Sequence, residues 1–370
     1  MSQGTKRPTS LIEAIRYFAD LDVCNEFVAA LRWPNGPYCP RCGSVEYSYL
    51  KTRRLWKCRD CAKQYSVKVG TIFESSPLGL DKWLPAVWLA ANTKNGISSH
   101  ELGRSLGVTQ KSAWFMLHRI RLAMQTEGFL LAGEVEADET FIGGKTGNKS
   151  PHQKRGKPRG GPGGKTPVFG VKERGGKVRA EVVPNVKGDT LKPKIAKAVK
   201  TGSAVYTDQA PAYRGLEGLG YDHDTVNHAE RYVDGRVHTN GLENFWALLK
   251  RGLNGTYVSV DPEHLFRYVD ERVFAFNGRH DSDYGRFSAV LGAAPGRRLT
   301  YADVTRPAVA VFVFLLVSCF GALTRPLSSA SKRSNSPFAS AVVSLALVMI
   351  VFPPGFVFMT FLPVVASVSP

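Results

Sequence analysis

The stretch Cys39-Pro-Arg-Cys42, followed after fifteen residues by Cys58-Arg-Asp-Cys61, decides the fold of the N-terminal part of this chain. Each Cys-x-x-Cys motif places two thiolates on one tight turn, and two such turns make a tetrahedral pocket for Zn²⁺. A pair of disulfides is the alternative, but the N-terminus does not resemble a secretory signal. The spacing therefore predicts a structural zinc site within a zinc ribbon.

The segment between the cysteine pairs alternates polar and aromatic residues, which predicts short strands. Basic and aromatic side chains on a small ribbon suit contacts with phosphates and bases. The candidates for DNA contact are Arg53, Arg54 and Lys57. A ribbon with a purely structural role is the alternative interpretation.

The chain of 370 residues is long enough for two or three domains and carries a formal charge of +18. This excess of Lys and Arg favours a polyanionic partner, either nucleic acid or an anionic membrane surface. The two remaining cysteines, Cys24 and Cys319, have no evident partner. Reduced thiols in a cytoplasmic protein fit this pattern best.

Helical periodicity flanks the ribbon on both sides. Residues 8–32 contain an amphipathic stretch in which Ser10 and Glu13 have the spacing of a capping box. Residues 81–126 contain a second stretch, whose first helix we expect Asp81 to cap.

The end of that second stretch resembles a helix-turn-helix. Ser98 would cap the first helix, Gly107 would make the turn, and Thr109 would cap the second helix. An ordinary helical hairpin is the alternative. The side chains of the second helix expected to meet a DNA groove are Gln110, Lys111, Ser112 and Arg119.

Residues 143–166 are basic and rich in Gly and Pro, so they cannot form a core. We predict a flexible loop, either beside a DNA-handling site or as a plain linker. Strands are predicted around it over residues 134–142, 168–172 and 178–183, with a hairpin turn at 174–177.

The sequence beyond the hairpin alternates helices and strands. We predict a helix over 190–199, a strand over 204–208, a strand near 224–228 and a helix from Asn240. The expected order is three strands, helix, strand, helix, strand, helix. This α/β order with a mixed sheet is that of the ribonuclease-H-like fold.

Three acidic residues lie at positions that this order of elements could bring close together. Asp138 and Asp208 each end a predicted strand, and these two strands are neighbours in a ribonuclease-H-like sheet; Glu243 on the last helix could reach the same point. Such carboxylates repel one another unless cations lie between them. Mg²⁺ or Mn²⁺ prefers oxygen ligands, and two such ions would clamp a phosphodiester. Ordinary surface carboxylates are the alternative.

Three stretches resemble the catalytic motifs of DDE insertion-sequence transposases. They are Val135-Glu-Ala-Asp138-Glu-Thr-Phe-Ile-Gly-Gly-Lys145, Val205-Tyr-Thr-Asp208-Gln-Ala-Pro-Ala-Tyr213 and His238-Thr-Asn-Gly-Leu-Glu243-Asn-Phe-Trp-Ala-Leu-Leu-Lys250. With the ribbon in front, residues 10–300 resemble the ISXO-type group of these transposases, the insertion-sequence family numbered fifteen ninety-five.

This resemblance implies that Asp138, Asp208 and Glu243 bind the catalytic Mg²⁺ or Mn²⁺ ions. Some members of the group have asparagine at the third position, so Asn240, one turn earlier, is the alternative to Glu243. Lys250 matches a basic residue that contacts DNA in the wider class. His238 is a further candidate for phosphate or metal, with a structural hydrogen bond at the helix start as its alternative.

Residues 301–370 depart from the family pattern. Asp303 is the last acidic residue, and two apolar runs follow over 307–323 and 339–368. One interpretation is a membrane hairpin with spans near the minimum length. The other, which we favour, is a non-native extension such as translation past a frameshift.

We therefore expect a helical lead-in (1–32), a zinc ribbon (33–76), a helix-turn-helix region (77–128), a ribonuclease-H-like DDE transposase domain (129–300) and an apolar extension (301–370). The predicted function is binding of terminal inverted repeats with metal-dependent cleavage and transfer of DNA strands. We expect double-stranded DNA of the element ends and target as partner, a homo-oligomer in the active complex, and a cytoplasmic, nucleoid-associated protein. A catalytically inactive DNA-binding protein is the alternative, and a membrane-tethered basic protein is less favoured.

Overall fold

The computed structural model describes residues 7–126, 128–143, 164–226 and 238–305, and the backbone of 346–352 and 356–362. The chain divides into one unit of residues 1–306 and a second of residues 307–370. In the second unit, β9 (Ala346–Phe352) pairs antiparallel with β10 (Phe356–Leu362). Among the described residues, no helix is long and apolar enough to cross a membrane. Most of the predicted loop 143–166 and the apolar run 307–323 lie outside the described residues.

The N-terminal part begins with two helices and a small sheet. α1 (Leu11–Tyr17) and α2 (Leu21–Arg32) precede an antiparallel sheet of β1 (Tyr47–Leu50), β2 (Leu55–Cys58) and β3 (Gln64–Tyr65). The Ser10 hydroxyl accepts from the Glu13 N–H at 3.4 Å, so the predicted cap of α1 is confirmed. The strands lie around the cysteine turns, as expected of a zinc ribbon.

Three helices follow the ribbon: α3 (Leu80–Asn92), α4 (Ser99–Leu106) and α5 (Gln110–Met124). Ser98 Oγ accepts from the Glu101 N–H at 3.1 Å, and Thr109 Oγ1 accepts from the Ser112 N–H at 3.2 Å. Gly107 ends α4 with a φ of 63°, a left-handed conformation that favours glycine. The predicted caps and turn of this helical pair are therefore confirmed. The predicted cap of α3 is wrong, because Asp81 lies within its first turn and Gly79 is the N-cap, with no side-chain cap hydrogen bond.

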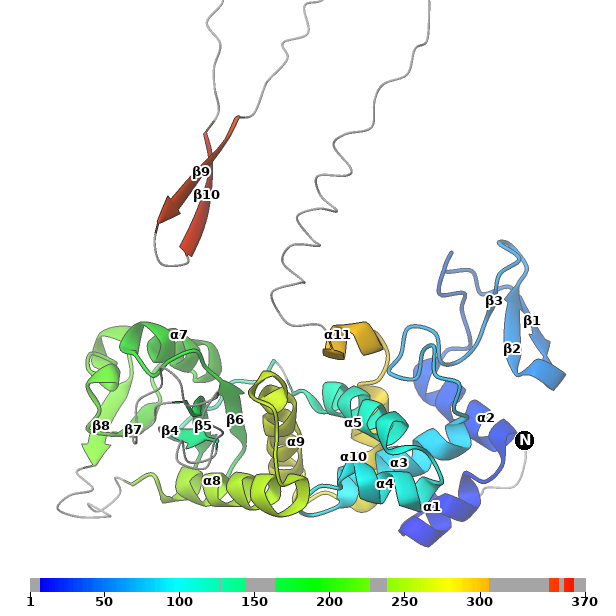
Figure 1. The fold of residues 1–370 in the computed structure, drawn as a ribbon, viewed down its shortest axis with the longest axis horizontal. Helices are drawn as coiled ribbons and strands as arrows, with labels where there is room; N and C mark the ends of the chain where they lie inside the picture. Colours follow the sequence, from blue (N-terminus) through cyan, green and yellow to red (C-terminus); the bar gives the residue numbers. More distant parts are fainter. Residues whose placement is uncertain are drawn as a thin grey trace, which may run out of the picture. The chain divides into compact units, whose positions relative to one another are not determined.

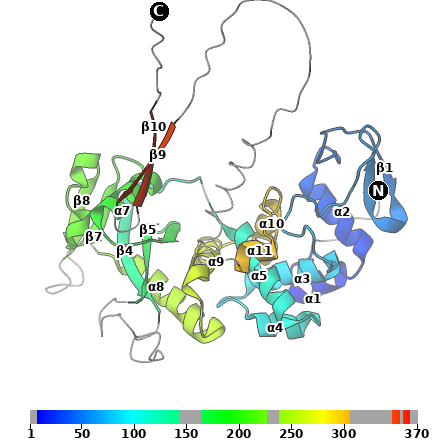
Figure 2. The ribbon, with the colours of Figure 1, turned by 45° about the horizontal axis from the view of Figure 1, so that its top comes forward.

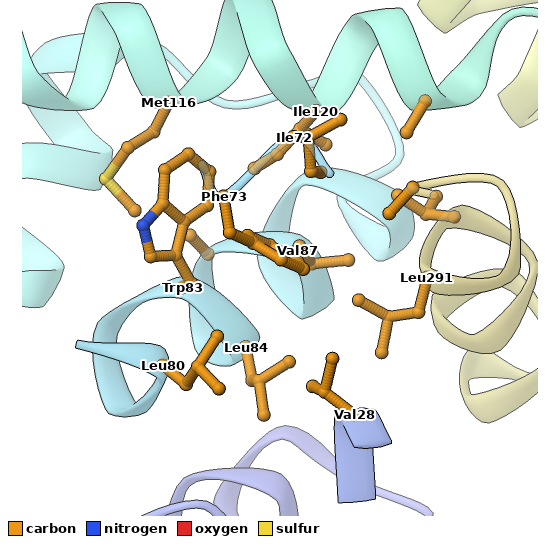
Figure 3. Close-up of a cluster of buried hydrophobic side chains, with 14 of the residues drawn as sticks. Val28, Ile72, Phe73, Leu80, Trp83, Leu84, Val87, Met116, Ile120 and Leu291 are labelled. Carbon is orange, nitrogen blue, oxygen red and sulfur yellow. The ribbon is translucent and has the colours of Figure 1, made fainter. Parts of the chain in front are cut away.

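A single apolar core joins these helices (Figure 3). Trp83, Leu84 and Val87 of α3 pack there with Met116 and Ile120 of α5. α10 (Asp283–Gly292) adds Phe287, Val290 and Leu291 to the same core. The apolar face of α10 is therefore buried against the N-terminal helices, although its sequence follows the residues of the larger sheet.

The larger sheet has the order β6-β5-β4-β7-β8. β4 (Glu134–Ile142), β5 (Thr166–Glu173) and β6 (Val178–Val182) are antiparallel, whereas β4, β7 (Ala204–Asp208) and β8 (Asp222–Val226) are parallel. This mixed order is the ribonuclease-H-like one, so the predicted ribonuclease-H-like mixed sheet is confirmed.

Helices cover both faces of this sheet (Figures 1 and 2). α7 (Gly188–Ala198) packs on one face through Leu191 and Ile195, and α8 (Asn240–Gly252) and α9 (Leu265–Asn277) cover the other. α9 also packs against α5, which joins the sheet to the N-terminal helices. The helix predicted between β7 and β8 is wrong: short 3₁₀ turns at Pro211–Tyr213 and Glu217–Leu219 make that connection.

Candidate active site and zinc site

The parallel pairing of β4 and β7 brings two predicted carboxylates together. Val135 lies beside Val205 and Glu136 beside Tyr206, and continuing this register puts Asp138 level with Asp208. Asp208 ends β7, as predicted. Asp138 does not end its strand: β4 continues to Ile142 because its other edge stays paired with β5, where Asp138 faces Gly170.

Asp138 is held from α8 by Trp246. The indole Nε1 donates to Asp138 Oδ2 at 2.9 Å. The ring lies against Gly170, where a Cβ would approach the indole carbon Cη2 to 2.7 Å. A glycine at this register position thus makes room for the side chain that orients the carboxylate.

The electrostatics of this edge disfavour a further negative charge. Burial raises the pKa of Asp138 to about 6; the Trp246 hydrogen bond opposes this shift, and the charges of Asp208 and Glu243 add to it. Glu243 lies on the exposed face of α8 and accepts from the Thr239 hydroxyl at 3.4 Å. The charges of Asp208 and Glu243 therefore both act on Asp138.

The side chains of Asp138, Asp208 and Glu243 are of the type that binds divalent cations. Carboxylate oxygens are the ligands that Mg²⁺ and Mn²⁺ prefer, and a cation would offset the burial and the neighbouring negative charges that raise the pKa of Asp138. They are less tightly gathered than the cysteines. Within the described ranges, the four cysteines are the one group of three or more His, Cys, Asp or Glu residues whose ligand atoms all lie within 4.8 Å of one another.

A fourth carboxylate at this edge was not predicted. Burial raises the pKa of Glu139 to about 7, and the charges of Asp208 and Asp138 contribute. The Tyr213 hydroxyl, itself buried, donates to Glu139 Oε2. Both residues lie inside the quoted motifs, but nothing in the sequence pairs a strand residue with a tyrosine 74 positions away.

Glu136, also unpredicted, anchors the start of α8. It is 1% exposed and its Oε2 accepts from the Leu242 N–H at 2.8 Å. Its Oε1 lies 3.5 Å from His238 Nδ1 and 3.6 Å from Arg174 Nε. His238 Nδ1 thus lies beside the Glu136 carboxylate at the start of α8, but it makes no hydrogen bond within the described residues. Asn240 and Lys250 are exposed on α8.

The four cysteines match a zinc site. Cys39 Sγ lies 3.6 Å from Cys61 Sγ, and Cys42 Sγ lies 3.6 Å from Cys58 Sγ. Zn–S bonds of about 2.3 Å in a tetrahedron separate the sulfur atoms by about 3.8 Å. The sulfur positions therefore fit one Zn²⁺ with only a small adjustment.

The predicted DNA-contact residues differ in their surroundings. Arg53, Lys57 and Lys111 are exposed, whereas Arg54 Nε donates to Asp22 at 2.6 Å. Gln110 Nε2 donates to Ser99 Oγ at 2.8 Å, and Ser112 Oγ accepts from the Thr109 hydroxyl.

Arg119 does not face a groove. It is 4% exposed, and its guanidinium donates to the backbone carbonyls of Ile72, Glu74 and Leu299. The prediction for Arg119 is wrong because its side of α5 is packed against Ile72 and Glu74, which lie between β3 and α3, and against Leu299.

A ribonuclease-H-like sheet with carboxylates at one edge, preceded by a zinc ribbon, is the architecture of a DDE-type transposase. Residues 130–277 match the ISXO2-like transposase domain, and residues 20–64 match the transposase zinc-ribbon domain. The chain belongs to the ISXO2-like transposase family.

Two relatives are similar to this chain. An uncharacterized transposase-like protein of Haemophilus influenzae is 37% identical over 101 residues, which is 27% of this chain and 81% of the relative. An uncharacterized protein in transposable element ISH50 of Halobacterium salinarum is 29% identical over 257 residues, 65% of this chain and 86% of the relative. The Mos1 strand transfer complex aligns at a TM-score of only 0.21 with 15% identity, covering 59% of this chain and 79% of that one.

Proposed function

We propose that this transposase binds the ends of its element and catalyses metal-dependent cleavage and transfer of DNA strands. The observation that carries the proposal is the register of β4 and β7, which sets Asp138 level with Asp208 on adjacent parallel strands. Glu243 of α8 acts on the same carboxylate. The three together form an acidic edge suited to divalent cations.

In this proposal, Asp138, Asp208 and Glu243 hold Mg²⁺ or Mn²⁺, which when bound supplies positive charge to the oxygens of a phosphodiester. Trp246 fixes Asp138 through its indole N–H. The Ala210 N–H donates to Asp208 Oδ1 at 3.0 Å and fixes the second carboxylate. The chemistry would be hydrolysis to a 3′-hydroxyl, followed by attack of that hydroxyl on a second strand.

DNA would be held by groups outside this edge. The exposed Arg53 and Lys57 of the ribbon and Lys111 of α5 are the proposed contacts of the N-terminal part. Lys250 lies seven residues after Glu243 on the exposed side of α8 and would reach a phosphate beside the reacting one. The active complex would contain more than one copy of the chain.

The test measures cleavage of labelled element-end DNA by the full chain with and without Mg²⁺. Asp138→Asn and Asp208→Asn should each lower cleavage about a thousandfold or more, because each removes a charge that balances the divalent ion. Asp222→Asn, at the exposed start of β8, is the matched control and should cleave normally. Equal activity of all three variants would exclude the proposed site.

A further inference from the structure

A cavity of about 470 Å³ lies beside α8, lined by residues other than the three proposed catalytic carboxylates. Its walls come from the α3–α4 connection, β5, α8 and α9. Trp246 reaches from α8 to Asp138, whereas the neighbouring Asn244 and Phe245 line the cavity. A volume of this size is typical of small-ligand sites.

Cationic side chains line this cavity without any acidic one: Lys94, Lys172, Arg272 and Arg279. Lys172 is 8% exposed, and its ammonium donates to the Glu173 carbonyl at 3.3 Å. Arg272 is 6% exposed. Burying cationic groups is costly unless anionic or polar groups compensate them. The cavity therefore favours an anionic ligand.

Arg272 has unused hydrogen-bonding capacity. Its Nη1 donates to the Lys94 carbonyl at 2.9 Å, but Nε and Nη2 have no hydrogen-bond partner within the described residues. Nη2 lies 3.9 Å from Glu271 Oε1, an oxygen that already accepts from the Tyr257 hydroxyl at 2.5 Å. The other oxygen of Glu271 accepts from Arg121 at 2.7 Å. Two buried donors of Arg272 thus have no acceptor within the described residues.

The remaining wall is apolar and aromatic. Phe245, Leu248 and Phe276 line it, and the Arg279 guanidinium lies 4.3 Å from the centre of the Phe276 ring. Aromatic rings and guanidinium planes are the surfaces on which nucleobases stack. Asn244 adds an amide that can both donate to and accept from a base edge.

We propose that this cavity binds a nucleoside phosphate unit. The base lies against Phe276 and Arg279, and the phosphate is bound by Lys94, Lys172 and Arg272. Two sources carry this chemistry: a nucleotide unstacked from DNA bound at the neighbouring acidic edge, or a free nucleotide. The DNA source rests on the proposed function, whereas the free source does not.

The test uses the full chain and three variants at exposed or half-buried positions. Lys94→Gln combined with Arg279→Gln removes charge, and Phe276→Leu removes the ring but keeps apolar volume. Lys200→Gln, at an exposed lysine outside the cavity, is the matched control. Calorimetric titration with deoxyadenosine monophosphate reports the free source. Element-end DNA with 2-aminopurine at successive positions reports unstacking by its fluorescence.

We expect saturable binding of the mononucleotide, or a fluorescence rise at one DNA position. Either signal should weaken about tenfold in the cavity variants, the loss expected for removed charge-assisted contacts, and stay unchanged in the control. Absence of both signals overturns the inference, as does inorganic phosphate binding as tightly as the mononucleotide. Cleavage of the same DNA without either signal would support the proposed function and refute nucleotide binding in the cavity. Mononucleotide binding without DNA cleavage would support the cavity as a nucleotide site and refute the proposed function.

Discussion

The indole N–H of Trp246 donates to Asp138 Oδ2 at 2.9 Å and ties α8 to the middle of β4. Because this hydrogen bond orients a proposed metal ligand, Trp246→Phe should lower Mg²⁺-dependent cleavage about tenfold while leaving binding of the element ends intact. Trp83→Phe makes the same chemical change in the N-terminal core, where the indole donates to Ser76 at 3.0 Å, and should cleave normally. Equal cleavage by the two variants would show that the indole only fills space.

Gly170 should be needed for the same arrangement. In Gly170→Ala the new methyl would approach Trp246 Cη2 to 2.7 Å, so the indole must move away from Asp138. We expect a loss of about 1–3 kcal/mol in the free energy of unfolding, together with weaker cleavage. Gly218→Ala, where a Cβ would meet nothing within 4 Å, is the control for both measurements. A stable, fully active Gly170→Ala protein would contradict this packing argument.

Glu243 is the proposed third carboxylate, and Asn240 is its rival on the same exposed helix. Glu243→Gln keeps the shape but removes the charge, so cleavage should fall by about two orders of magnitude or more. Asn240→Ala should cost much less. The measurement is Mg²⁺-dependent cleavage of labelled end DNA by both variants. An active Glu243→Gln protein beside an inactive Asn240→Ala protein would reverse the assignment.

The four cysteines should bind one Zn²⁺ per chain. Cys39→Ser and Cys58→Ser should lose that metal, measured by elemental analysis, and unfold the ribbon, because ligation supplies much of the folding free energy of a small zinc module. Cys24→Ser is the control, since the Cys24 thiol is buried and donates to the Phe18 carbonyl away from the metal turns. It should keep its zinc even if it is less stable. A reduced wild-type chain without zinc would refute the site.

Stability should fall in acid because of His118. Burial, helped by the charges of Arg121, Arg267 and His264, lowers the pKa of His118 to about 2. Below the ordinary value of about 6.5, the unfolded chain takes up a proton that the native chain refuses, so stability present above that pH is lost as pH falls. From pH 7.5 to 5.0 the loss should be about 2 kcal/mol.

Urea unfolding of His118→Phe at the two pH values measures this effect. Between the two pH values, the free energy of unfolding of the variant should fall by about 2 kcal/mol less than that of the wild type, because a phenyl ring does not titrate. His100→Gln, at an exposed position of α4, should behave as the wild type. Identical pH dependence of His118→Phe and the wild type would show that His118 is not the source.

Local patterns predicted local structure well. The caps at Ser98 and Thr109, the turn at Gly107 and the strand that ends at Asp208 all depend on neighbours within a few residues. The prediction for Arg119 failed because the contacts of this residue are with groups far away in the sequence. A basic residue on an amphipathic helix suits a DNA groove equally well, and only the carbonyl groups of Leu299 and Ile72, far away in sequence, show that it is buried.

By itself, the sequence determined the cysteine pairs of the zinc ribbon and most strands of the larger sheet, because cysteine spacing and hydrophobic periodicity are properties of short segments. The motif carboxylates were predicted from the resemblance to DDE transposases. Tertiary structure decided what those groups touch. It formed the hydrogen bonds from Trp246 to Asp138, from Tyr213 to Glu139, and from the start of α8 to Glu136. It also placed α10 in the N-terminal core. The physical reason is that burial, charge and hydrogen bonding act over a few ångströms of space, whereas these partners lie 74 to 108 residues apart in the chain.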